Sequence, residues 1–289
     1  MLTILFDGIA YGMLLFILAV GLSVTMGLMN FINLAHGAFA MAGGYLTVVL
    51  MQRHDLPFLL CLPLAFGATA LVGAVLERTL YRPMYRKPHL DQVLFSIGLT
   101  FMSVAAMDYF MGSQQQIMQL PEWLRGRTEW FDGALGMGHY RLFIIAICAA
   151  LTVALQLVLS RTRFGSRLRA SVDDPRVAAG LGINVNVVFA ATFAVGSGLA
   201  GLGGALGAEV LGLDPTFPLK FMVYFLIVVA VGGTTSITGP LLAALLLGVA
   251  DVAGKYFIPK LGAFIVYSLM IAILIWRPQG LFSRLGGGK

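Results

Sequence analysis

Polar, uncharged side chains interrupt the long apolar segments of this chain at three places. Hydroxyl, amide and imidazole groups set among apolar residues either line a path for a polar solute or hydrogen-bond one membrane helix to another. We expect a solute path to use Asn30, Asn33, His36, Ser96, Thr100, Thr234, Thr235 and Ser236. Helix-to-helix bonding or capping stays open for each of them, because residue type does not separate the two roles.

Spacing indicates how these groups are presented. Ser96 and Thr100 are four residues apart and share one face of a helix. Asn30, Asn33 and His36 lie where two apolar segments meet. The other three follow the pair Gly232-Gly233, and short, Gly-interrupted apolar segments often mark broken helices in transporters.

Motifs for catalysis fail on context, so we expect no catalytic residue and no metal site. Gly196–Gly201 fits the pattern Gly-x-Gly-x-x-Gly, but no strand precedes it, so close packing of helices is the better interpretation. No Walker A sequence occurs, and the histidines and two cysteines have no metal-ligand or nucleophile spacing.

The acids nearest the apolar segments are expected at outer helix ends. They are Asp7, Asp108, Glu209 and Asp251. Lys255 follows Asp251 by four residues, which permits an ion pair on a helix. A lack of ionisable groups at membrane depth argues against a proton- or sodium-coupled carrier and against an intramembrane enzyme.

Composition defines the elements that must position these groups. Hydrophobic residues make up 59% of the chain and charged residues 11%, against about 25% charged in soluble proteins. Phe58–Leu76, Leu142–Leu159 and Phe264–Trp276 carry no charge, and about 20 apolar residues in a helix cross a bilayer. Met1–Tyr11 lacks the basic residues of a signal peptide, so the first segment is expected to be retained.

Apolar runs predict an all-α, polytopic integral membrane bundle of about eight to ten transmembrane or half-spanning helices, in one domain over residues 1–289. Two segments, 37–51 and 221–231, are short for a span and fit either discontinuous helices or badly bounded tilted ones. The nine predicted segments are 8–29, 37–51, 58–77, 92–112, 140–159, 184–208, 220–232, 239–257 and 262–276.

Charge placement predicts the orientation. When the connections are assigned alternately to two sides, one side receives 12 of the 19 basic residues and four acids, including Glu77. The other side receives seven basic residues and nine acids. The positive-inside rule makes the first side cytoplasmic, with the N-terminus outside and the C-terminus inside. The basic balance therefore reflects topology and does not call for nucleic acid.

The connection with the most sequence signals is the basic stretch 161–183. Asp173 or Asp174 is placed to cap a short helix with Pro175 in its first turn. Val177, Ala178 and Leu181 recur at helical spacing, and Gly182 ends the run. This pattern fits a docking helix, and it also fits a solvated basic turn that only fixes topology.

The same stretch resembles the cytoplasmic coupling loop of permeases of the branched-chain amino acid ABC importer family. The resemblance rests here on Gly165, Arg169-Ala170, Asp173-Asp174, Ala178 and Gly182-Ile183. Three further elements occur in the family's order, with Gly-Gly-Tyr in place of the commoner Gly-Ala-Tyr. They are Asn33–Gly37 with Gly43-Gly44-Tyr45, Gly232-Gly233 with Ser236 and Gly239-Pro240, and Arg277–Phe282.

The resemblance implies a permease subunit in a bacterial inner membrane. Two permeases, identical or homologous, would form the path, two cytoplasmic ATPases would use ATP and magnesium, and a periplasmic binding protein would deliver substrate. This subunit would bind no cofactor itself. Arg169 with both acids would hold the coupling loop, and Val177, Ala178 and Leu181 would fill a groove of the ATPase.

Several alternatives remain open at this point. Branched-chain amino acids are the first substrate expected, and urea, short amides or small organic acids are the alternative within the superfamily. An ion-coupled secondary carrier is the alternative from another class, and an essential buried acid would favour it.

Overall fold

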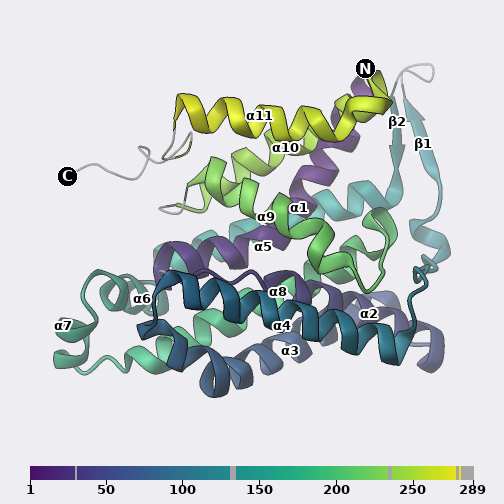
Figure 1. Ribbon diagram of the computed structural model, residues 1–289. Coiled ribbons are helices and arrows are strands. Elements are labelled where there is room, and N and C mark those ends of the chain that lie inside the picture. The colour runs from purple at the N-terminus through teal and green to yellow at the C-terminus, as the bar shows by residue number, and fades with distance from the viewer. Residues whose placement is uncertain (30, 131–134, 234–235, 278–279, 281–289) are drawn as a thin grey trace.

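The computed structural model describes residues 1–29, 31–130, 135–233, 236–277 and 280. Its helices lie side by side with two distinct ends (Figure 1). The helices are α1 Leu2–Met29, α2 His36–His54, α3 Phe58–Leu76, α4 His89–Met111, α5 His139–Arg161, α6 Arg163–Asp173, α7 Pro175–Gly180, α8 Val185–Leu211, α9 Phe217–Gly232, α10 Thr238–Phe257 and α11 Gly262–Trp276. A π-helical turn Glu77–Tyr81 and a 3-10 turn Arg82–Arg86 extend α3, and short 3-10 turns occupy Glu122–Leu124 and Pro259–Leu261.

Every predicted apolar segment forms a helix, so the all-α membrane bundle is confirmed. Six stretches of the described chain are long and apolar enough to cross a bilayer. Of the two short segments, α2 extends to 19 residues, about 28 Å at 1.5 Å per residue. Helix α9 has 16 residues and reaches only about 24 Å, short of the roughly 30 Å hydrocarbon core.

The two ends of the bundle differ in the elements that they carry. The hairpin end, named for the antiparallel strands β1 Arg127–Trp130 and β2 Leu135–Gly138, lies on the right in Figure 1. The α6–α7 end, which holds those two helices, lies on the left. The connection between α4 and α5 contains this hairpin, and an ion pair between Arg141 and Asp7 lies at the same end.

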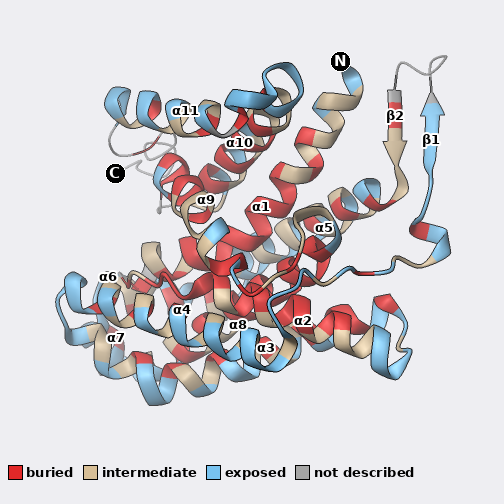
Figure 2. Cartoon of the chain, turned by 45° about the vertical axis from the view of Figure 1, so that its right-hand side comes forward, coloured by how far each residue is buried: buried red, intermediate tan, exposed pale blue. Residues whose placement is uncertain are grey.

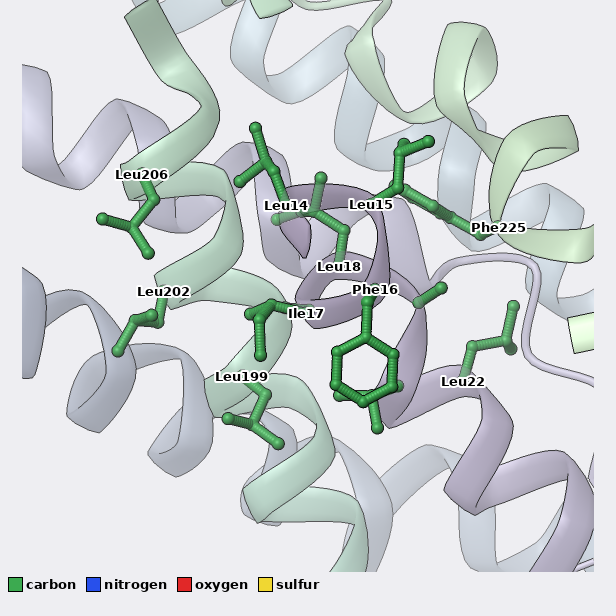
Figure 3. Close-up of a cluster of buried hydrophobic side chains, with 14 of the residues drawn as sticks. Leu14, Leu15, Phe16, Ile17, Leu18, Leu22, Leu199, Leu202, Leu206 and Phe225 are labelled. Carbon is green, nitrogen blue, oxygen red and sulfur yellow. The ribbon is translucent and has the colours of Figure 1, made fainter. Parts of the chain in front are cut away.

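Helices α1 and α8 form the centre. Figure 2 shows α1 buried over most of its length, and α8 packs against α1, α2 and α3. Side chains of α1, α8 and α9 meet around Phe16 in Figure 3. Small residues let the backbones approach, since a Cβ at Gly204 would overlap the carbonyl oxygen of Ala40 on α2. The glycines of α8 thus serve close packing, as predicted.

The connection between α1 and α2 turns back into the protein. Nε2 of His36, the first residue of α2, lies 2.9 Å from the carbonyl oxygen of Leu18, eleven residues before α1 ends at Met29. At 1.5 Å per residue, α1 runs about 16 Å beyond the level at which α2 begins. The intervening Phe31 and Ala35 are fully buried. Helix α2 thus starts deep in the bundle, at a break.

Candidate functional site

Helix α7 is built as its sequence predicts. Asp174, not Asp173, is the cap: its Oδ1 accepts from the backbone N–H of Arg176 at 2.8 Å and of Val177 at 3.0 Å. Pro175 takes the first helical position, where its missing N–H has no partner to lose. Gly182 has φ of +82°, and the N–H of Ile183 reaches back to the carbonyl of Ala178 at 3.1 Å, so the helix ends at a left-handed glycine.

Helix α6 was not predicted, and it carries four of the expected coupling residues. Gly165, Arg169, Ala170 and Asp173 all lie on it, with Asp173 as its last residue. Phe164 and Leu168, four apart, face the bundle. A Cβ at Gly165 would overlap the carbonyl of Leu159 on α5, and the Arg169 guanidinium donates to that same carbonyl. Arg169 thus holds α6 against α5.

The outer surface of α7 presents two of the three apolar residues expected to meet a partner. Val177 is 59% exposed and Leu181 is 75% exposed. Ala178 departs from the expectation, because it is 1% exposed on a helix that rests on α8. Its small side chain lets α7 lie close to the bundle, so it offers a partner no surface.

Asn33 anchors the α1–α2 connection. Its Oδ1 accepts from the Tyr81 hydroxyl at 3.2 Å and from the backbone N–H of Ala35 at 3.1 Å. Tyr81 belongs to the π-helical turn after α3 and packs edge-on against Phe31. The Asn33 Nδ2 atom is buried and has no hydrogen-bond partner among the described residues. A buried amide without a partner costs free energy, so this group is available for a bond in another conformation.

A polar stripe on α4 faces the same connection. Gln92, Ser96 and Thr100 are the buried residues of α4. Gln92 Oε1 accepts from the Ile32 N–H at 3.3 Å. Gln92 was not singled out from the sequence, although its four-residue spacing from Ser96 is the available signal. The Thr100 hydroxyl donates to the Ser96 carbonyl at 2.8 Å, so it bonds its own helix.

The candidate path residues fall into three groups. Asn33, His36, Ser96 and Thr100 are each at most 2% exposed and offer no surface to a solute in this conformation. Ser236 is partly exposed, and its Oγ accepts from the Gly239 N–H at 3.3 Å at the start of α10. Asn30, Thr234 and Thr235 lie outside the described residues. A path role for the buried four stays a prediction about another state.

One cavity brings the two predicted groups together. It has a volume of about 280 Å³ and opens at the α6–α7 end between α1, α5, α6 and α10. Gly165 and Arg169 of α6 line it together with Ser236 at the α9–α10 break. Ser23 of α1 and Gln156 of α5, which the sequence did not single out, complete its polar wall. Helix α6 and the α9–α10 break thus face the same cavity.

Two acids are buried within the protein, which the sequence did not predict. Glu77 is fully buried in the continuation of α3, where Arg82 lies 3.2 Å away and the Tyr85 hydroxyl donates at 3.2 Å. Asp251 is 1% exposed and forms the predicted pair with Lys255. Each acid thus has a cationic partner in this conformation.

Asp214 organises the turn before α9 and was not singled out from the sequence. Its Oδ1 accepts from the Thr216 N–H at 2.8 Å, and its Oδ2 accepts from the Lys220 ammonium. Burial alone would raise the pKa of Asp214, but the hydrogen bonds from Lys220 and Thr216 outweigh it and lower the pKa.

This pKa shift predicts acid sensitivity of the α8–α9 turn. A carboxylate whose pKa is lowered on folding stabilises the fold at neutral pH, and that contribution is lost as the pH falls through the lowered value. We expect the Thr216 and Phe217 amides to lose hydrogen-exchange protection only below the usual pH range of aspartate titration. Asp214→Asn should lose this protection already at pH 7, and equal protection in both proteins would contradict the assignment.

Comparison with known proteins places the whole chain in one family. The family model described as "Branched-chain amino acid transport system / permease component" matches residues 4–274. The permease protein LivH of Salmonella typhimurium is 27% identical over 97% of this chain and 94% of its own length. BraD of Pseudomonas aeruginosa is 27% identical over 97% and 95%, respectively.

Further relatives extend this pattern. LivM of Salmonella typhimurium, also named as a permease protein of the high-affinity branched-chain amino acid transport system, is 28% identical over 93% of this chain and 68% of its own length. No solved structure matches the chain significantly. The family match spans both the α1–α2 break and the α6–α7 element. This chain therefore belongs to the family of branched-chain amino acid transport system permease components.

Proposed function

We propose that this chain is the inner-membrane permease subunit of an ATP-driven importer that moves branched-chain amino acids, or similar small polar metabolites, into the cell. The single observation that carries the proposal is the α6–α7 element. It exposes Val177 and Leu181 beside arginines, and its α6 half lines a cavity with Ser236 of the α9–α10 break. A partner that pushes α7 would thus move a wall of the bundle.

The proposal includes partners of defined position. Cytoplasmic ATPases dock on α7 and use ATP and magnesium, and this chain binds neither. A second permease, identical or homologous, completes the path, and a periplasmic binding protein meets the hairpin end. The charge count supports this orientation, because 12 of the 19 basic residues fall on the side of α6 and α7.

Substrate preference follows from the relatives. Each relative compared above is named for branched-chain amino acid transport, which supports leucine, isoleucine and valine as first substrates. The buried polar residues at the α1–α2 break, Asn33 and His36, would meet the solute only when α2 moves. Uptake of labelled leucine into vesicles, with and without the binding protein, tests this assignment directly.

The docking role is tested by the double substitution Val177→Asp and Leu181→Asp. Two buried charges in an apolar interface weaken binding, so we expect co-purification of the ATPase to fall by about tenfold or more. Leu261→Asp, at an exposed apolar position of the hairpin end, is the control and should keep the ATPase. Leucine uptake by a complex without any ATPase would overturn the proposal.

A further inference from the structure

A wholly apolar cleft lies between α5 and α8, beside α6. Its volume is about 340 Å³. Helix α5 contributes Leu155 and Val158, α6 contributes Phe164 and Leu168, and α8 contributes Val195 and Leu199. Across the described chain, α5 packs on α1 and α6 and has little contact with α8, so the space between them is left unfilled.

The cleft opens on the outside of the bundle. Val158 is 40% exposed and Val195 is 38% exposed, one on each side of the opening. An apolar cavity stays dry, and its α5 and α8 walls belong to helices long and apolar enough to span a bilayer. Its lining in the membrane therefore suits a hydrocarbon chain.

Three arginines lie close in sequence to the α5 and α6 residues that line this cleft. Arg161 follows the lining residue Val158 by three positions, Arg163 precedes Phe164, and Arg167 follows Phe164 by three. Residues three apart are neighbours on a helix surface. All three arginines are exposed, and no acid occurs between Arg161 and Val172. Arginine binds phosphate by paired hydrogen bonds, and basic residues on an amphipathic helix beside a span attract anionic lipids.

We propose that this cleft binds an anionic phospholipid, with an acyl chain between α5 and α8 and its phosphate on Arg161, Arg163 and Arg167. The apolar lining matches the acyl chain of a phospholipid, and the arginines match its phosphate group. Because Phe164 and Leu168 form one wall, the bound lipid would hold α6 in place, and lipid composition would act on the element that Arg169 also secures. The binding itself does not depend on the proposed ATPase docking.

Native mass spectrometry of the purified membrane complex tests the site. The complex is exchanged into micelles that contain phosphatidylglycerol or phosphatidylcholine with the same acyl chains. We expect retention of phosphatidylglycerol to exceed that of phosphatidylcholine by about tenfold or more. Replacing Arg161, Arg163 and Arg167 by glutamine should reduce it to the phosphatidylcholine level. Arg176→Gln on α7 is the matched control and should leave the preference intact.

A second variant tests the acyl chain. Val195→Trp fills the cleft and should lower retention of both lipids, whereas Val153→Trp, at an exposed position of α5 that does not line the cleft, should lower neither. Equal retention of both lipids by the unaltered complex would overturn the proposal, as would an equal loss with Arg176→Gln. Disulfide cross-linking of two Val158→Cys chains would overturn it too, by assigning the cleft to a second copy.

Discussion

Gly204→Ala is expected to disrupt the packing of α2 on α8 and to destabilise the protein. The added Cβ would overlap the carbonyl oxygen of Ala40. That atom belongs to helix backbone, so it cannot move aside as a side-chain end would. Alanine favours a helix over glycine by about 1 kcal/mol, whereas overpacking costs about 1–3 kcal/mol or more. Because the overlap is with backbone, we expect the cost to prevail.

The glycines of α3 and α4 provide a control with the same chemical change. A Cβ at Gly67 or Gly98 would meet no atom within 4 Å. Gly67→Ala and Gly98→Ala should therefore be neutral or stabilising by up to about 1 kcal/mol. The midpoint of detergent-induced unfolding separates these outcomes. If Gly204→Ala unfolds at the same midpoint as Gly98→Ala, then α2 and α8 are not in the close contact described here.

The α2–α8 contact is important for stability because of how helices associate in a bilayer. Lipid tails are as apolar as leucine, so helices in a membrane associate through close packing and hydrogen bonds. The α2–α8 contact relies on small residues at both surfaces, since Gly43 meets Gly201 and Gly204 meets Ala40. The sequence predicts this kind of packing from glycine frequency, but which helices meet depends on contacts far apart in the chain.

Local sequence patterns predicted most of the helices of the fold. They did not predict which helices contact one another. In a bilayer, an apolar run of about 20 residues favours a helix. Each predicted segment formed one within about three residues of its bounds, except that α1 begins six residues earlier than predicted. Helix α6 was missed because its arginines read as a loop, although Phe164 and Leu168 carry a helical spacing. The β1–β2 hairpin was missed because Arg127–Trp130 has no strict alternation of apolar and polar residues.

The sequence predicted those parts of the candidate site that depend on local features, and not those that depend on contacts between distant residues. The cap at Asp174 and the stop at Gly182 are local features and were readable within a few residues. The contact of Asn33 with Tyr81 joins residues 48 apart, and the cavity that unites Arg169 with Ser236 joins residues farther apart still. Burial of Ala178 also depends on α8, so the sequence could not distinguish it from the exposed Val177.

The buried acid Glu77 carries the second large expected effect. Arg82→Met removes the guanidinium 3.2 Å from a fully buried carboxylate. Among the described residues, the Tyr85 hydroxyl is then the one remaining hydrogen-bond donor to it. Breaking a buried pair from one side costs about 3–5 kcal/mol. Because the Arg82 side chain is 37% exposed and water screens part of the interaction, we expect a loss of about 2–3 kcal/mol.

A double substitution shows whether the loss comes from the unpaired charge. Glu77→Gln together with Arg82→Met removes both charges, so stability should recover most of what Arg82→Met alone loses. The detergent-unfolding midpoints of the two single variants and the double variant give the coupling directly. Additive losses would mean that Glu77 and Arg82 do not interact. Coupled losses together with unchanged leucine uptake by the double variant would make the pair structural, whereas uptake that needs Glu77 itself would favour an ion-coupled carrier.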